Sequence, residues 1–132
     1  AYGINADRTY YLAAECLIRT GKIREGLAFV DKVRNMRVED CQNFTDLYDE
    51  GGMSEKEAMQ LLQKAKWIEC LGSYENFFDC KRWNSEEGYK QTITRNLGED
   101  LGSYSISPES SLWVLPFPSN AVRYNPTLTQ NY

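Results

Sequence analysis

The feature that most limits the possible folds of this chain is a pair of helical segments with almost no linker between them. The first is predicted over residues 7–20, where Asn5 or Asp7 can cap its start and Gly21 is placed to end it in a left-handed conformation. The second is predicted over residues 23–36 from one apolar stripe, formed by Ile23, Leu27, Val30 and Val33. Because the connection is so short, the two helices are expected to form an antiparallel hairpin.

Small and apolar residues recur along this hairpin at regular offsets. The set is Ala14, Leu17, Gly21, Gly26, Val30 and Val33. The spacing resembles the helix-turn-helix of a tetratricopeptide repeat, in which small side chains let two backbones approach closely. Only one such unit is visible in the sequence, and a single repeat cannot bury its own apolar face. We therefore expect the hairpin to pack against further structure.

The rest of the chain divides into a helical pair and a tail. Ser54 and Glu57 have the spacing of a capping box, and they open a helix predicted to run to Gly72. Ser73 then caps a shorter helix that ends near Trp83. Residues 41–52 are interpreted as a loop. We predict one all-α domain over residues 1–132. It consists of a hairpin at 7–36, a helical pair at 54–84 and a mostly irregular, proline-containing tail at 85–132 that packs on the helices. Within the tail, "TITRNL" can form a short strand.

Composition excludes several classes of function. The chain has 132 residues, 42% of them apolar, and a net charge of −4, which argues against non-specific binding to nucleic acid or to anionic membranes. No uninterrupted apolar run is long enough to span a membrane. Histidine is absent, which removes the commonest general base and zinc ligand. We expect no cofactor and no metal.

The cysteines and the start of the chain give weaker indications of function than the overall composition does. The chain has four cysteines, which are Cys16, Cys41, Cys70 and Cys80. No two of them have the CxxC spacing of a zinc site. Cys16 and Cys70 sit among apolar helix positions, which favours buried free thiols, although one disulfide is left open. The chain begins without Met and without a signal-peptide pattern, which suggests a processed protein or a piece of a longer one.

Two stretches carry a resemblance to a known family. The first is "YENFFDCKRWN", in which Asp79, Arg82 and Trp83 occupy the positions of a D-L-x-R-W motif and Cys80 stands where Leu is usual. The second is the closing stretch, an apolar-Pro-x-Pro segment followed by N-P-x-L-x-Q-N. Its matching residues are Leu115, Pro116, Pro118, Asn125, Pro126, Leu128, Gln130 and Asn131. Together with the hairpin, these stretches resemble the C-terminal part of SusD/RagB-like proteins of Bacteroidetes. The sequence departs from the family where Ser73 to Asn76 replace E-G-x-R and where Lys66-Trp67 replace an ER pair.

The resemblance implies a binding protein rather than an enzyme. Such proteins are lipoproteins on the outward-facing surface of the cell outer membrane, where they capture glycans or other nutrients for a TonB-dependent SusC-like transporter. The lipid anchor that the resemblance implies is expected to lie outside the residues of this chain. The resemblance also implies that the C-terminal tail is ordered against the helical body, with its Leu and aromatic side chains buried against the helices. The alternative is a helical-repeat adaptor or scaffold that binds a protein partner and no small molecule.

The ligand-binding residues are not fixed by the sequence. Trp67 and Trp83 are candidates for stacking on a sugar ring, but a structural role is favoured for Trp83, with Asp79 paired to Arg82 at i,i+3. Trp113, beside an aliphatic run, is expected to be buried. The residues assigned a structural role are Asp79, Arg82, Trp83, Pro116, Pro118, Asn125, Pro126, Gln130 and Asn131.

Charged residues do not add a catalytic site. The acidic pairs Glu86-Glu87 and Glu99-Asp100 do not lie in a segment that predicts a cleft, so a glycosidase is not favoured. The helix charges Glu15, Asp31, Lys32 and Arg34 are interpreted as solvated.

Overall fold

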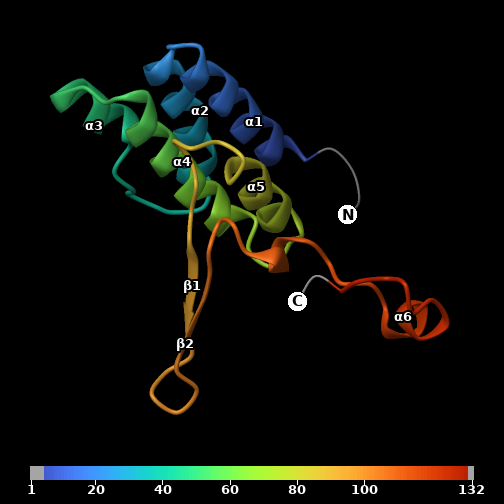
Figure 1. The fold of residues 1–132 in the computed structure, drawn as a ribbon. Helices are drawn as coiled ribbons and strands as arrows, with labels where there is room; N and C mark the ends of the chain where they lie inside the picture. Colours follow the sequence, from blue (N-terminus) through green and yellow to red (C-terminus); the bar gives the residue numbers. More distant parts are fainter. Residues whose placement is uncertain (1–4, 131–132) are drawn as a thin grey trace. The chain divides into compact units, whose positions relative to one another are not determined.

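The computed structural model describes residues 5–130, and its helices dominate, which confirms the all-α prediction. The elements in chain order are α1 (Ala6–Arg19), α2 (Ile23–Asn35), α3 (Phe44–Gly51), α4 (Glu55–Glu69), α5 (Glu75–Trp83), β1 (Ile93–Asn96), β2 (Ser103–Ile106), the 3₁₀ turn η1 (Ser111–Trp113) and α6 (Ser119–Tyr124) (Figure 1). They form two compact units, a helical unit that ends at Asn76 and a tail unit that begins at Phe77. The single-domain interpretation stays a prediction.

The predicted hairpin is confirmed as α1 and α2, which pack side by side in the helical unit (Figure 1). Asn5 caps α1, because its side-chain oxygen accepts a hydrogen bond of 2.9 Å from the backbone N–H of Asp7. Gly21 follows the helix with φ at +82°, a left-handed conformation that glycine adopts without strain. The chain then turns at once into α2, as the short linker requires.

Gly26 shows why small residues recur along the hairpin. A Cβ atom placed on it would lie 2.6 Å from Cγ1 of Ile18 and 2.8 Å from the backbone oxygen of Ala14. Both distances are shorter than carbon makes with neighbouring atoms, so α1 and α2 approach this closely only because the side chain is missing. On either side of the contact Ile18 and Leu27 are fully buried. The tetratricopeptide-like spacing therefore reports a real close approach of two backbones.

Helix α4 supplies the further structure against which the hairpin packs. It begins at the predicted capping box: Ser54 Oγ accepts from the N–H of Glu57, and the Glu57 carboxylate accepts from the N–H of Ser54. It contacts both α1 and α2 and contributes the fully buried residues Ala58, Met59 and Leu62 to their core. Burying a side chain of the size of Met or Leu stabilises the fold by roughly 1.5–3 kcal/mol. Ser73 also caps α5 as expected, by accepting from the N–H of Glu75.

The prediction of a loop over residues 41–52 was wrong, because α3 lies there. Its first turn is held by Asp31 of α2, whose carboxylate accepts hydrogen bonds from the N–H groups of Phe44 and Thr45, each at 2.9 Å, and from the Thr45 hydroxyl at 3.0 Å. These bonds satisfy donors that a helix start leaves unpaired. Asp31 is only 5% exposed, so its interpretation as a solvated charge was also wrong. The side chain that caps α3 therefore belongs to α2.

Two neighbouring residues of α1 have the opposite environments to those expected. Glu15 is 5% exposed and pairs with Arg19 at 2.9 Å, whereas Cys16 is exposed. The buried stripe of α1 consists of Tyr11, Ala14, Glu15 and Ile18, so Cys16 falls on the other face. Cys70 is buried as expected, and all four cysteines are free.

The tail unit contains more regular secondary structure than the sequence predicts for residues 85–132. β1 and β2 form an antiparallel hairpin in which Ile93 pairs with Ile106 and Asn96 with Ser103, so the strand predicted in "TITRNL" is confirmed. Trp113 is 8% exposed, as expected, and its Nε1 donates to the Ser107 carbonyl at 2.8 Å. Its ring centroid lies 5.5 Å from that of Phe77.

The expectation that the apolar side chains of the closing segment would be buried was wrong for three of them. Leu115 is 78% exposed, Phe117 49% and Tyr124 83%. The segment is ordered by its own hydrogen bonds instead. The Gln130 side chain accepts from the N–H of Phe117 at 3.1 Å and donates to the Phe117 carbonyl at 2.9 Å. These bonds hold the backbone without burying its side chains.

Candidate functional site

Two surface hollows are lined entirely by described residues of the helical unit. The first, here named the Tyr10–Phe29 hollow, has a volume of about 300 Å³, and its lining residues are Ala6, Thr9, Tyr10, Ala13 and Phe29. The two ring centroids are 5.5 Å apart, and the Lys32 ammonium lies 5.6 Å from the Tyr10 centroid and 5.0 Å from that of Phe29. This hollow offers ring faces and two hydroxyls, but its lining is otherwise apolar.

The second hollow, here named the Arg37 hollow, has a volume of about 210 Å³ and a more mixed lining. Its residues come from α1, from α2 and the segment after it, and from α4; they are Tyr11, Arg34, Arg37, Val38, Cys41, Ala65, Ile68 and Glu69. Val38 and Ile68 are 55% and 64% exposed, so they form an open apolar rim. Apolar walls with a few converging polar groups are the usual chemistry of a small-molecule site.

Arg37 ties the elements around this hollow together. Its Nη2 donates to carboxylate oxygens of Asp7 at the start of α1 and of Glu69 at the end of α4, the latter at 2.9 Å. The hydrogen bonds and charge of Glu69, followed by the charge of Asp7, raise the pKa of Arg37 above its ordinary value. Arg34 is held by Asp31, because its Nη1 donates to Asp31 Oδ1 at 3.0 Å. Both guanidinium groups are therefore already neutralised by carboxylates.

Tyr11 stands at the inner wall of the Arg37 hollow. Its side chain is 1% exposed, and its hydroxyl makes no hydrogen bond to any other residue in the range 5–130. Burial, followed by the negative charge of Glu69, raises the pKa of Tyr11 to about 12. The hydroxyl thus keeps its proton at neutral pH and can donate it to a hydrogen-bond acceptor.

The two tryptophans predicted as ligand contacts lie in different units. Trp67 belongs to α4 and is half-buried, and its backbone carbonyl accepts from Asn76 Nδ2 at 2.9 Å. Trp83 ends α5 and is 1% exposed. Asp79 and Arg82 form the expected i,i+3 ion pair at 3.1 Å, and the Arg82 guanidinium lies 5.3 Å from the Trp83 ring centroid. Neither tryptophan lines one of the two hollows.

The motif residues of the closing segment form a local hydrogen-bonded unit. Pro116 and Pro118 flank Phe117, whose N–H and carbonyl are both bound by Gln130. Asn125, which precedes Pro126, accepts from the Thr127 hydroxyl at 2.6 Å and so forms the turn expected at an Asn-Pro pair. Asn131 lies outside the described residues.

Sequence reasoning missed Tyr11, Arg37 and Glu69. They come from three separate segments, and no local pattern marks them as partners. The acidic pairs Glu86-Glu87 and Glu99-Asp100 do not line either hollow. Within residues 5–130, no group of three or more His, Cys, Asp or Glu side chains is arranged to hold a metal ion. None of the helices that the structure describes has the length and apolar character to cross a membrane.

Comparison with known proteins places the chain in a family. No match was found among curated proteins or among solved structures. The family model described as "SusD family" matches residues 6–132, which takes in both the helical unit and the tail unit. Members of that family are binding proteins rather than enzymes, and their general role is to bind nutrients. Because the match covers nearly the whole chain, this protein belongs to the SusD family.

Proposed function

We propose that this protein binds an oligosaccharide at the outward-facing surface of the cell outer membrane and passes it to a TonB-dependent SusC-like transporter. The observation that carries the proposal is the SusD-family match over residues 6–132. The protein would be held at the membrane by a lipid and would act by binding alone.

The surface of the helical unit has the chemistry that sugar binding uses. A sugar ring presents C–H groups that pack on aromatic or aliphatic surfaces and hydroxyls that need hydrogen-bond partners. The Tyr10–Phe29 hollow offers ring faces, and the Arg37 hollow offers donors beside an apolar rim. Of the two tryptophans, Trp67 is half-buried, whereas Trp83 is buried and is assigned a structural role with Asp79 and Arg82.

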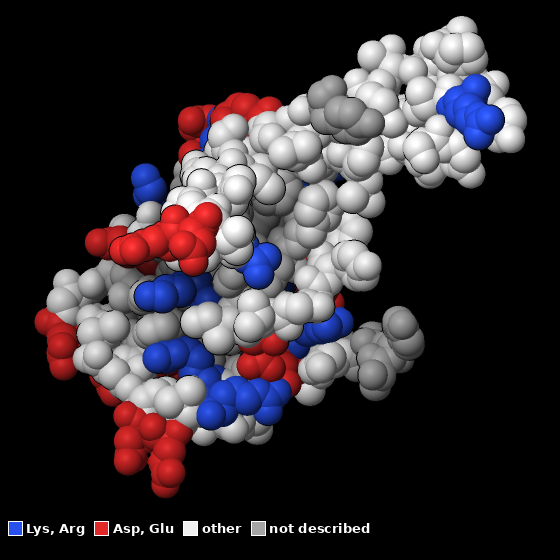
Figure 2. Space-filling view, turned by 90° about the horizontal axis from the view of Figure 1, so that it is seen from below, with Lys and Arg blue, Asp and Glu red and all other residues white. Residues whose placement is uncertain are grey.

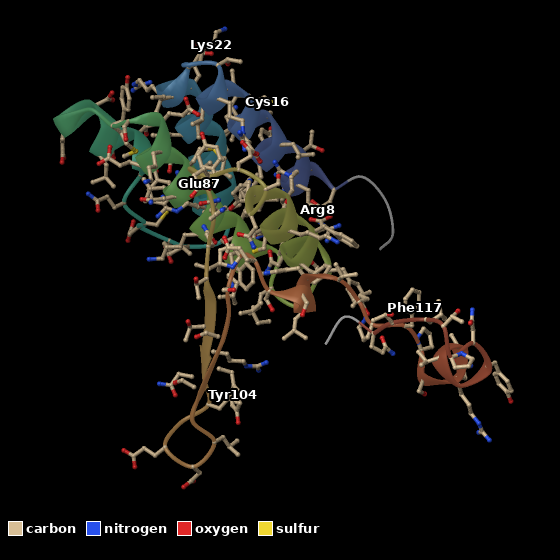
Figure 3. All side chains as sticks on the ribbon, in the orientation of Figure 1. Arg8, Cys16, Lys22, Glu87, Tyr104 and Phe117 are labelled. Carbon is tan, nitrogen blue, oxygen red and sulfur yellow. The ribbon has the colours of Figure 1, made fainter. Side chains whose placement is uncertain are left out.

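A second function is favoured by the tail unit. Val114, Leu115, Phe117 and Tyr124 leave large apolar surfaces exposed, and Arg123 is the only charged residue between positions 110 and 130. Phe117 projects from the stretch that leads into α6 (Figure 3), and the α6 segment is nearly free of blue and red in Figure 2. Exposed apolar surface of this kind is typical of protein contacts. It fits a transporter partner, and it equally fits the adaptor alternative.

The melting temperature of the full chain in the presence of neutral oligosaccharides separates these two functions. A ligand at ten times its Kd stabilises the folded state by about 1.4 kcal/mol, which raises the melting temperature of a small domain by several degrees. A nutrient-binding protein should show this shift with at least one of the α- and β-linked glucan, mannan, galactan and xylan oligomers. An adaptor should show none and should still retain a protein partner on affinity purification. Co-purification of a TonB-dependent transporter would support the proposed partner.

A further inference from the structure

We propose that the Arg37 hollow is a subsite for a single neutral sugar ring, with the Tyr11 hydroxyl as its central hydrogen-bond donor. This inference rests on the proposed function, and it adds a place and a chemistry to it. It begins from one unusual group. A buried tyrosine hydroxyl normally has a hydrogen-bond partner, since an unpaired one costs stability. The hydroxyl of Tyr11 has no hydrogen-bond partner among residues 5–130, although the residue is almost fully buried, with only 1% of its surface exposed.

The Tyr11 oxygen is not sealed inside the protein. Among the described residues, the polar side-chain atoms that are both fully enclosed and without a hydrogen-bond partner do not include this oxygen. Because the oxygen has no partner there, it must keep some access to solvent. Tyr11 lines the Arg37 hollow, and Glu69 and Arg34, whose charges act on its hydroxyl, line the same hollow. Burial and the nearby Glu69 carboxylate keep the hydroxyl protonated. A donor therefore lies at the inner wall of an open hollow, with its partner still to be supplied.

The other polar groups of the hollow limit the charge of a ligand. Arg37 is bound by Glu69 and Asp7, and Arg34 by Asp31. An anion would be repelled by the two carboxylates that surround the single positive charge of Arg37, and a cation would meet the guanidinium groups themselves. A neutral ligand avoids both costs. The donors of Arg37 that are bound to carboxylates are Nε and Nη2, which leaves Nη1 without an acceptor among the described residues and able to bond a ligand oxygen.

The apolar rim and the volume limit the shape of a ligand. Ala65 and the exposed Ile68 and Val38 offer an aliphatic surface beside the donors. A pyranose ring matches this combination, because it presents C–H groups on one face and hydroxyls around its edge. The hollow of about 210 Å³ lies below the roughly 300–1,000 Å³ of sites for drug-sized molecules, so it suits one ring and not an extended chain.

The test is a titration of the ¹⁵N-labelled full chain by NMR. The probes are the methyl glycosides of glucose, mannose, galactose and xylose, with glucuronate as the charged counterpart. A single ring is expected to bind with a Kd on the order of 1–10 mM. Amide signals of Tyr11, Val38, Ile68 and Glu69 should shift with at least one neutral glycoside, and glucuronate should bind more weakly.

Two matched variants identify the donor. Tyr11→Phe removes only the hydroxyl and should weaken binding by roughly two- to tenfold, the value of one hydrogen bond. Tyr48→Phe makes the same change in α3, on a residue that lines neither hollow, and should bind as the unsubstituted chain does. The melting temperature of Tyr11→Phe should be unchanged, since the lost hydroxyl has no protein partner, which shows that the variant is folded.

The outcomes separate this inference from the proposed function. If the chain binds neutral oligosaccharides but Tyr11→Phe binds them equally well, or the shifts lie elsewhere, then Tyr11 bonds only water and the subsite is refuted, while the proposed function stands. If no neutral glycoside or oligosaccharide binds at all, both are refuted.

Discussion

Replacing Gly26 with alanine tests the close approach of α1 and α2, on which the helical unit depends. The new Cβ would meet Ile18 Cγ1 at 2.6 Å and the Ala14 backbone oxygen at 2.8 Å. The Ile18 side chain can rotate, but the backbone oxygen can move only if α1 moves. Overpacking of this kind costs about 1–3 kcal/mol, whereas alanine gains at most about 1 kcal/mol over glycine in helix propensity. We expect Gly26→Ala to lower the free energy of unfolding by about 1–2 kcal/mol.

Urea unfolding followed by circular dichroism measures this change. With a slope of about 2 kcal/mol per molar urea, the midpoint should fall by roughly 0.5–1 M. Gly51→Ala is the matched control, because Gly51 lies in α3 and its added Cβ would have no atom within 4 Å. It should be neutral or slightly stabilising. A Gly26→Ala protein as stable as the unsubstituted chain would refute the close packing of the two backbones.

Three further predictions concern the cap of α3, the Tyr11 hydroxyl and the closing segment. Asp31→Asn weakens charge-assisted hydrogen bonds to the start of α3 and should cost about 1.5–3 kcal/mol in urea unfolding, with faster amide exchange in α3; unchanged values would contradict the remote cap. Tyr11 should ionise near its raised pKa of about 12, seen as the difference in absorbance between the chain and Tyr11→Phe, whereas ionisation near 10 would show that the side chain is solvated. Because the folded-state pKa lies above the unfolded value, this contribution to stability is complete below pH 10 and is lost between about pH 10 and 12, by about 2–3 kcal/mol. Gln130→Ala removes both bonds to the Phe117 backbone and should speed exchange of that amide about tenfold, without changing the melting of the helical unit; equal exchange rates would show that the bonds do not order the segment.

The elements that sequence reasoning found are those with local signals. Gly21 and the Ser54–Glu57 box set helix ends through contacts within a few residues, so they can be read from the chain directly. The start of α3 cannot, because its cap is Asp31, which precedes Phe44 by thirteen residues. A remote cap depends on the packing of α2 against α3, and packing is not visible in a local pattern.

The candidate site was missed for the same reason. Tyr11, Arg37 and Glu69 become neighbours only after α1, the segment that follows α2, and α4 have packed. Aromatic residues drew attention to Trp67 and Trp83, but Trp83 is buried in the fold. In the tail, the family resemblance implied burial of the aromatic side chains, whereas the Gln130 side-chain amide orders the backbone at Phe117 and leaves that ring half-exposed.

Affinity electrophoresis of the full chain tests the central claim most directly, which is that this SusD-family protein captures glycans by binding alone. The chain is run through native gels that contain neutral polysaccharides, and the same polysaccharides are assayed for new reducing ends after incubation with the protein. The account predicts retarded migration in at least one polysaccharide and no increase in reducing ends. Unretarded migration in every polysaccharide, or the release of reducing ends, would contradict it.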